Sequence, residues 1–466
     1  MTGYLIPEKD KTMTAFSKKK LAGVLAVVTA TALTLTGCST PSPYAAGDGV
    51  LKLGGVLPLT GSLAFLSPPE IAGVDLAIAD INAAGGVLGQ PVEWDLQDSS
   101  DGDNPAIAPA SATKLLDSGV DAIVGAAASG VTRLIIDQVT KAKVVQISMS
   151  NTAPDLSTWD DGGYYFRTAP SDLLQGAIVG NQIVAAGKEN VAIIYQQSPY
   201  GEGLVAKAKG TLEAAGATIV SELSFPEGES NFDTIVDQTV AAGADSLLVI
   251  SYDEFKKIAP ALQKKGFPGS DIFLVDGNLA NYSDKGFASY LEGAKGTLPG
   301  GELNEDLKSR AAALYKEKYG EELVEFSYLA ETYDAVMLLA LAAEQAKNDS
   351  GEAIAANMTS VSTGGEKVST FAEGLAAIKA GKDIDYEGFS GPIEFDENGD
   401  PTGASIGIYQ YGADGTYVFL EAVAGNSELN RQERLISRQK ILQLKKLLVL
   451  RSDLLESRRL SQNQSE

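Results

Sequence analysis

The sequence lacks histidine altogether and contains one cysteine, Cys38, among its 466 residues. The absence of histidine excludes every site in which an imidazole is essential. Such sites are imidazole general acids and bases, Ser-His-Asp and Cys-His nucleophile pairs, and His-ligated zinc or haem centres. A single cysteine excludes an internal disulfide and a cysteine metal cluster. These absences remove the most common enzyme mechanisms, so we expect no catalytic activity, no metal and no cofactor.

Positive charge is also scarce. Lysine and arginine number 37 against 61 aspartates and glutamates, which gives a formal net charge of −24. A phosphate-backbone partner requires a basic surface, so we expect no nucleic acid partner. The apolar run at residues 21–35 is shorter than the ~20 residues that a bilayer-spanning helix needs, so a transmembrane anchor is not expected.

Residues 1–37 have the layout of a secretory signal. Residues 18–20 are lysines, residues 21–35 are almost all Leu, Ala, Val and Thr, and Leu35-Thr36-Gly37-Cys38 follows. This last motif resembles the lipobox of bacterial lipoproteins, in which the cysteine receives a diacylglyceryl group. The resemblance implies an extracytoplasmic protein that is lipid-anchored to the cell membrane through Cys38; the alternative is a plain signal peptide. Residues 38–49 are then a tether.

Beyond residue 50, short apolar runs alternate with amphipathic helical stretches. Continuous apolar strands separated by helices indicate βαβ units and parallel sheets. Eight units are too many for one small sheet, so we predict an α/β fold of two doubly wound parallel-sheet lobes. The expected strands are residues 51–57, 92–96, 122–124, 144–147, 191–195, 218–223, 246–250 and 272–275.

The predicted lobes are each built from two stretches of chain. Lobe 1 takes residues 50–166 and 300–390, and lobe 2 takes residues 167–299 and 391–426. Connections at residues 166–168, 296–299 and 391–393 are expected to form a three-strand hinge. Residues 427–466 are basic and Leu-rich, unlike the acidic remainder, and are either an amphipathic helix or an appended extension.

Three short motifs resemble chemical sites. The Ser-x-x-Lys motif at residues 111–114 is that of penicillin-binding enzymes, but its usual partner motifs do not follow and it falls in a predicted surface helix. Asp98, Asp101 and Asp103 could bind Ca²⁺, yet they suit a turn and helix N-cap better. Residues 201–203 lack the third glycine of a dinucleotide fingerprint. None of these motifs supports a function on its own.

Polar residues follow several predicted strands, at the edge where ligands bind in open α/β sheets. In the first lobe they supply hydrogen-bond donors, and in the second an acid and two aromatic rings. A cleft with such complementary ends suits a zwitterion. The residues are Ser129, Asn151, Thr152, Tyr200, Tyr252 and Asp276.

Four stretches in the same order resemble the leucine/isoleucine/valine-binding family of type I periplasmic solute-binding proteins, over roughly residues 50–423. They are residues 55–61 (Gly-Val-Leu-Pro-Leu-Thr-Gly), 79–87, 151–156 and 200–203. The resemblance implies that the ligand carboxylate is held by Ser129, Asn151 and Thr152, and its ammonium by Asp276. It also implies that the Tyr200 and Tyr252 rings cover the ligand and that Phe65 and Leu66 contact its side chain.

The sequence therefore predicts a monomeric, non-enzymatic solute-binding lipoprotein of an ABC importer. It should bind a small amino acid or related zwitterion between its lobes and present it to membrane permease subunits. Three alternatives remain: another small ligand such as an amide, urea or aromatic acid, a sensory receptor subunit without a transporter, and a Ser-Lys hydrolase acting through Ser111.

Overall fold

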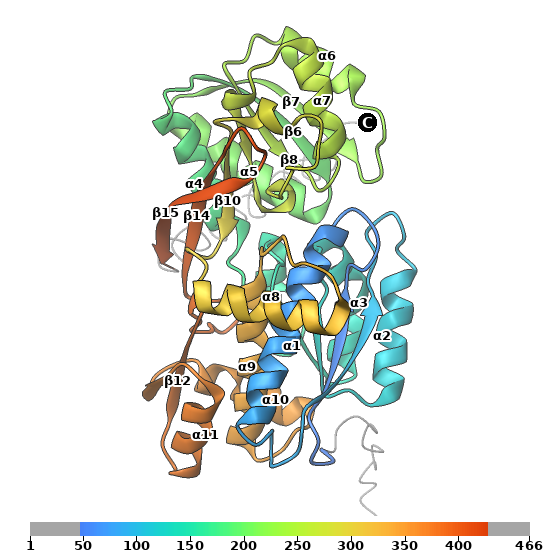
Figure 1. Ribbon diagram of the computed structural model, residues 1–466, viewed down its shortest axis with the longest axis vertical. Coiled ribbons are helices and arrows are strands. Elements are labelled where there is room, and N and C mark those ends of the chain that lie inside the picture. Colours follow the sequence, from blue (N-terminus) through green and yellow to red (C-terminus); the bar gives the residue numbers. More distant parts are fainter. Residues whose placement is uncertain (1–46, 427–466) are drawn as a thin grey trace, which may run out of the picture. The chain divides into compact units, whose positions relative to one another are not determined.

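The computed structural model describes residues 47–426, so Cys38 and the C-terminal extension lie outside the described residues. The first sheet has five parallel strands in the order β2-β1-β3-β4-β5 (Figure 1). Every residue of β3 and β4 is buried, as expected for central parallel strands covered on both faces. The strands are β1 (Lys52–Leu57), β2 (Glu93–Asp98), β3 (Ala122–Gly125), β4 (Val145–Ser148) and β5 (Tyr165–Arg167).

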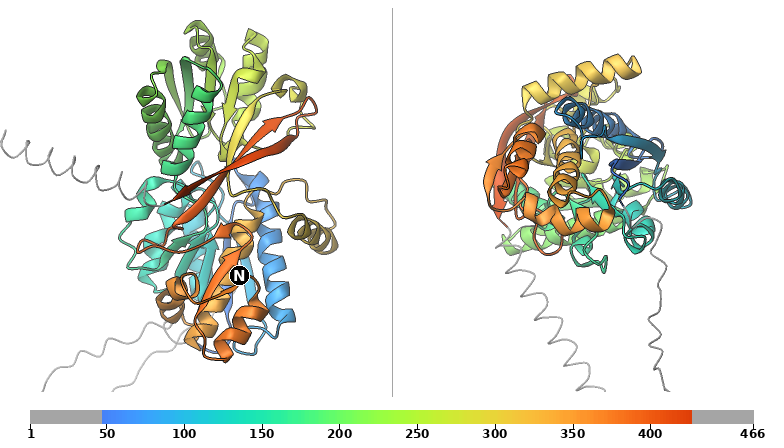
Figure 2. Two further views of the ribbon diagram at one scale, coloured as in Figure 1. Left: turned by 90° about the vertical axis from the view of Figure 1, so that its left-hand side faces the viewer. Right: turned by 90° about the horizontal axis from the view of Figure 1, so that it is seen from below.

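The second sheet has seven strands in the order β15-β14-β10-β9-β8-β6-β7. Its members are β6 (Asn190–Gln197), β7 (Thr218–Pro226), β8 (Ser246–Ile250), β9 (Ile272–Leu274), β10 (Lys295–Pro299), β14 (Gly403–Tyr411) and β15 (Tyr417–Asn426). Strands β14 and β15 run antiparallel to their neighbours, so this sheet is mixed rather than purely parallel. Figure 2 shows these two strands side by side at the red end of the colour scale.

Helices cover both sheets. The first lobe, which is the five-stranded sheet and the elements packed on it, carries α1 (Ser67–Ala83), α2 (Ile107–Ser118) and α3 (Ser129–Lys141), and also α8 (Glu305–Tyr319), α9 (Leu329–Ala346), α10 (Gly351–Val361) and α11 (Phe371–Lys379). The second lobe, built on the seven-stranded sheet, carries α4 (Asp172–Ala185), α5 (Pro199–Ala214), α6 (Asp233–Ala241) and α7 (Phe255–Lys265). Helix α8 crosses α1 on the outside of the first lobe (Figure 1).

A small sheet of β11 (Glu366–Val368), β12 (Ile384–Gly388) and β13 (Gly391–Pro392) lies between α10 and β14 in the sequence. The chain passes between the lobes three times: from β5 to α4, from β10 to α8, and from β13 to β14. Whether these crossings act as a hinge stays a prediction. Within residues 47–426, no helix combines the length and the apolar character that a membrane crossing requires.

The α/β fold and all eight strands expected from the sequence are confirmed. Three further strands, β5, β10 and β13, lie where connections were expected. The β10 segment contains Gly296 and Pro299, which have low strand propensity, but it pairs with β9 on one side and β14 on the other. Pairing that the sequence does not reveal therefore overrides the local preference.

Candidate functional site

One small pocket lies between the two lobes at the carboxyl ends of their strands. It is lined by Leu63, Leu66, Ala127, Ser129, Ser150, Tyr200, Tyr252, Asp276, Gly277 and Tyr328. The free space inside is about 10 Å³, so the lobes meet closely here. The structure thus brings Leu66, Ser129, Tyr200, Tyr252 and Asp276, five of the residues singled out in the sequence, to one place.

Ser129 marks the first-lobe side of the pocket. It is the first residue of α3, and the residue before it, Ala128, provides no side-chain cap for the helix. The Ser129 hydroxyl oxygen accepts hydrogen bonds from the amides of Thr152 and Ala153, both at 3.3 Å. An uncapped helix N-terminus together with a buried hydroxyl suits a carboxylate.

Three other predicted residues do not line the pocket. The Asn151 amide group donates to the carbonyls of Ala126 (2.9 Å) and Ala127 (2.7 Å), so it fixes the loop backbone instead. The Thr152 side chain is buried and is a hydrogen-bonding neighbour of Asp172. Phe65 is half-buried and packs against the core. Cys38 lies outside the described residues.

Asp276 lies on the second-lobe side, in a short 3₁₀ turn (Asp276–Asn278) that follows β9. Its Oδ1 accepts hydrogen bonds from the Tyr200 hydroxyl at 2.6 Å and from Gln175 Nε2 at 3.0 Å. Its Oδ2 accepts one from the Tyr328 hydroxyl at 2.5 Å. Burial raises the pKa of the Asp276 carboxyl, and these three donors oppose that rise.

Two tyrosine rings form one wall. Tyr200 is in the first turn of α5 and Tyr252 follows β8, and their rings stack at a centroid distance of 5.4 Å and an interplanar angle of 16°. Burial raises the pKa of both hydroxyls well above the usual value, so both remain neutral. Neutral phenols can donate hydrogen bonds while their faces cover an apolar group.

Asp172 was not singled out in the sequence. It opens α4 after the N-cap Ser171, and its carboxylate is buried with the Thr152 side chain as a hydrogen-bonding neighbour. Burial first, and then the negative charge of Asp276, raise the pKa of Asp172 well above its usual value. Two buried carboxyl groups that repel one another form a strong attractor for a cation.

Tyr328 was also missed. Helix α9 begins only at Leu329, because the left-handed backbone of Tyr328, with φ 62°, breaks the helical conformation there. This break in the helix turns the Tyr328 hydroxyl toward Asp276 on the other lobe. No periodic pattern could have revealed such a residue.

Glu70 lies behind the pocket wall on α1. Its Oε1 accepts a hydrogen bond from the Ser150 hydroxyl at 3.0 Å, and its Oε2 has no partner among the described residues. Burial raises the pKa of Glu70 to about 8. Since Ser150 lines the pocket, Glu70 sets the direction of that hydroxyl.

The motifs weighed as alternatives are engaged elsewhere. The Ser111 hydroxyl donates to the Asp98 carbonyl at 2.6 Å, while Lys114 donates to Gln97 at 2.9 Å, so the two do not form a nucleophile pair. Asp101 accepts from the Ser62 amide at 2.9 Å. Over residues 47–426, no group of three or more acidic, cysteine or histidine side chains is arranged to hold a metal ion.

A two-lobed α/β fold with a polar pocket between the lobes defines the solute-binding protein class. The sequence profile of the periplasmic binding protein family matches residues 50–416, and the chain belongs to this family. The resemblance found in the sequence is thereby confirmed.

One related protein and two solved structures illustrate what this chain is similar to within the family. The chain is 29% identical over 381 residues to the leucine-, isoleucine-, valine-, threonine- and alanine-binding protein of Pseudomonas aeruginosa, covering 80% of this chain and 93% of that protein. It resembles the isoleucine complex of the branched-chain amino acid transporter substrate-binding protein of Streptococcus pneumoniae, with a TM-score of 0.66, 25% identity and coverage of 81% and 99%. A solute-binding protein of an ABC transporter from Rhodopseudomonas palustris, in complex with 3,4-dihydroxybenzoic acid, shares the fold with a TM-score of 0.65, 18% identity and coverage of 81% and 98%.

Proposed function

We propose that this protein is the extracytoplasmic solute-binding component of an ABC importer and that it binds a zwitterionic amino acid in the pocket between its lobes. The observation that carries this proposal is the charge layout of the pocket. Asp276 lines the pocket from the second lobe, with the buried Asp172 close enough to act on it electrostatically, and the uncapped start of α3 with Ser129 faces the pocket from the first lobe. One pole suits an ammonium group and the other a carboxylate.

The same layout weighs against the rival ligands. An aromatic acid would bring a negative charge into a site that already holds two buried carboxyl groups, and an amide or urea would leave both without a counter-charge. The pocket wall of Tyr200, Tyr252 and Leu66 suits an aliphatic side chain. We therefore propose an aliphatic amino acid, with the branched-chain type first.

Attachment and partners belong to the same proposal. A diacylglyceryl group on Cys38 would keep the protein at the outer face of the cell membrane, because two acyl chains give stable anchoring where one does not. From there the ligand-loaded monomer would dock on permease subunits. Intact-mass analysis of the mature protein tests the anchor: an unmodified Cys38 would contradict it.

The decisive experiment is a thermal-shift and calorimetric screen. The panel contains leucine, isoleucine, valine, alanine and threonine, with 3,4-dihydroxybenzoate, urea and acetamide as rivals. A ligand at 100 times its dissociation constant stabilises the folded protein by about 2.7 kcal/mol, which gives a clear shift of the melting temperature. Binding of an aromatic acid with no response to any amino acid would refute the proposed ligand class.

A further inference from the structure

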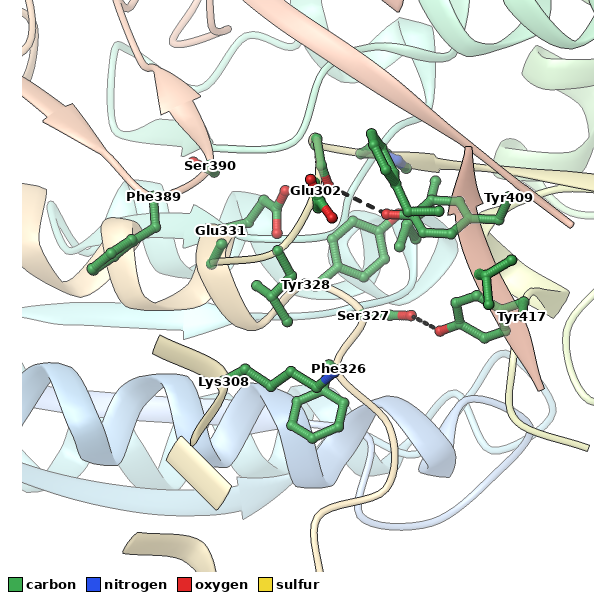
Figure 3. A pocket seen from close by; sticks show the side chains of 18 of the residues that line it. Glu302, Lys308, Phe326, Ser327, Tyr328, Glu331, Phe389, Ser390, Tyr409 and Tyr417 are labelled. Atoms are coloured by element: carbon green, nitrogen blue, oxygen red, sulfur yellow. Dashed lines mark hydrogen bonds between the residues drawn. The ribbon is translucent and has the colours of Figure 1, made fainter. Parts of the chain in front are cut away.

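A second, larger cavity lies beside the chain crossings. It encloses about 500 Å³, a volume typical of small-molecule sites (Figure 3). Its walls come from both lobes and from the crossing after β10. The aromatic and apolar side chains that line it include Leu298, Phe326, Tyr328, Phe389, Tyr409 and Tyr417.

The charges of this cavity are mostly negative. Glu302, Glu305 and Glu331 line it against one cation, Lys308. Lys308 is already engaged, since its ammonium lies 3.5 Å from the Glu305 carboxylate and 5.0 Å from the centroid of the Phe326 ring. Glu302 and Glu331 therefore remain without a basic neighbour among the lining residues.

Glu331 is the unusual member of this set. It is 4% exposed, and no other side chain of the described residues forms a hydrogen bond or ion pair with its carboxylate. Space for the carboxylate depends on Gly300, where a β-carbon would lie 2.6 Å from Glu331 Oε1. A buried carboxylate that faces a cavity with aromatic walls is a binding group for a cation with an apolar body.

We propose that this cavity, referred to below as the crossing cavity, is a second binding site for an organic ammonium ion with an aromatic or aliphatic body, and that Glu331 pairs with the ammonium. Burial raises the pKa of Glu331 to about 8, so a bound cation would favour the ionised carboxylate that an empty cavity disfavours. The apolar walls would cover the body of the ligand, as Figure 3 shows for the rings around the cavity.

The crossing cavity shares a wall with the pocket between the lobes. Tyr328 lines both, and its hydroxyl donates to Asp276. The backbone carbonyl of Glu331 also accepts a hydrogen bond from the Thr168 hydroxyl, at 2.9 Å, in the first crossing. An occupant that touches both lobes in this closed arrangement favours it over an open one, and so should strengthen ligand binding between the lobes. This coupling, unlike the binding itself, rests on the proposed function.

The first test uses wild-type protein and three probes of similar shape: 2-phenylethylammonium, neutral 2-phenylethanol and anionic 3-phenylpropanoate. Calorimetry without any amino acid should detect the ammonium probe at least about tenfold more tightly than the alcohol, with no binding of the anion. Equal affinity for the ammonium and the alcohol, or no binding of the ammonium, would overturn the proposal. This comparison of probes uses only the wild-type protein, so its outcome does not depend on whether any variant folds.

Variants then locate the site. Glu331→Gln should weaken binding of 2-phenylethylammonium at least about tenfold, whereas the matched rim substitution Glu305→Gln should leave it within about twofold, because Glu305 is 84% exposed. Asp276→Asn should weaken it less than Glu331→Gln does, since Asp276 does not line this cavity and reaches it only through Tyr328. Loss of the probe in Asp276→Asn but not in Glu331→Gln would place the probe in the pocket between the lobes and refute the second site.

The coupling has its own measurement. If leucine or another amino acid binds, a saturating amount of 2-phenylethylammonium should raise that affinity by about fivefold or more, and the amino acid should raise the affinity for the probe by the same factor. An unchanged affinity would refute the coupling but not the site. Failure of every amino acid to bind would count against the proposed function and leave the probe result intact.

Discussion

The sharpest prediction concerns the ammonium pole of the pocket between the lobes. In a closed site the ligand ammonium is removed from water and needs a paired anion. Asp276 and Asp172 are the two buried carboxyl groups on that side. Breaking one partner out of a buried charge pair costs about 3 to 5 kcal/mol, which is roughly two to four decades of affinity at about 1.4 kcal/mol per decade. Asp276→Asn should therefore lose at least two decades of affinity for the amino acid.

Asp172→Asn tests the second carboxyl group. Burial and the nearby charge of Asp276 raise the pKa of Asp172, which favours its protonated form in the unliganded protein, and an arriving ammonium should shift it toward the ionised form. Wild-type binding at neutral pH should then release protons, and binding should strengthen as the pH rises through the raised pKa. Asp172→Asn should abolish that release and reduce the affinity at least about tenfold.

The assay is calorimetry in two buffers of different ionisation enthalpy, which separates proton release from binding heat. Asp253→Asn is the matched control, because Asp253 is next to Tyr252 but 38% exposed and paired with Lys256. Asparagine at position 276 also deprives one of the three donors of its acceptor, so the free energy of unfolding without ligand should fall by about 1 to 3 kcal/mol. Affinity within about threefold of wild type in Asp276→Asn would refute the ammonium assignment.

Three further predictions concern charges away from the ligand. Burial raises the pKa of Glu70 from 4.5 to about 8, so the unfolded chain loses this proton above about pH 4.5 while the folded protein keeps it up to about pH 8. The free energy of unfolding is therefore highest below about pH 4.5 and falls as the pH rises to 8. Glu70→Gln should be more stable than wild type at pH 8, by about 3 to 5 kcal/mol in urea unfolding, and equal to it at pH 4.5. Asp400→Asn should lower the free energy of unfolding by about 3 to 5 kcal/mol, because it leaves the fully buried Arg167 guanidinium without its counter-ion, and a loss under 1 kcal/mol would contradict this. Burial and the negative charge of Asp103 on the opposite lobe raise the pKa of Glu227 to about 7. At pH 8 the ionised Glu227 repels Asp103 across the lobes, so Glu227→Gln should bind ligand more tightly than wild type. Near pH 6 Glu227 is mostly protonated and the two proteins should match, as titrations at both pH values would show.

The sequence predicted the central strands of both sheets because these strands, such as β3 and β8, are continuous apolar runs. Once the strands were located, the rule that ligands bind at strand carboxyl ends also selected residues that meet at one pocket, such as Ser129 after β3 and Asp276 after β9. Both steps rely on local patterns. Asn151 shows the limit of this reasoning, because it lies in the correct loop but its amide group bonds the backbone of Ala126 and Ala127.

The missed residues depend on tertiary contacts. Asp172 follows a serine at the start of a helix, so its sequence context is that of an ordinary first-turn acid, and nothing local shows that it is fully buried beside Asp276. Arg167 was read as part of a connection, yet its guanidinium forms a bidentate ion pair with Asp400, 233 residues away. Periodicity cannot show either burial or a partner at that separation.

We propose that charge, rather than fold, selects the ligand of this protein. The relatives include an isoleucine complex and a 3,4-dihydroxybenzoic acid complex on the same two-lobed fold, so the fold alone accommodates a zwitterion or an anion. Here the Tyr328 hydroxyl donates to Asp276 in the pocket between the lobes, and Tyr328 and Glu331 both line the crossing cavity. Burial raises the pKa of Asp276, of its neighbour Asp172 and of Glu331, so a bound cation would favour the ionised form of each. Tyr328 is common to both sites, so a cation that orders this side chain at one site reduces the conformational entropy lost when the second ligand binds. The two sites should therefore respond to each other even though their ligands never touch.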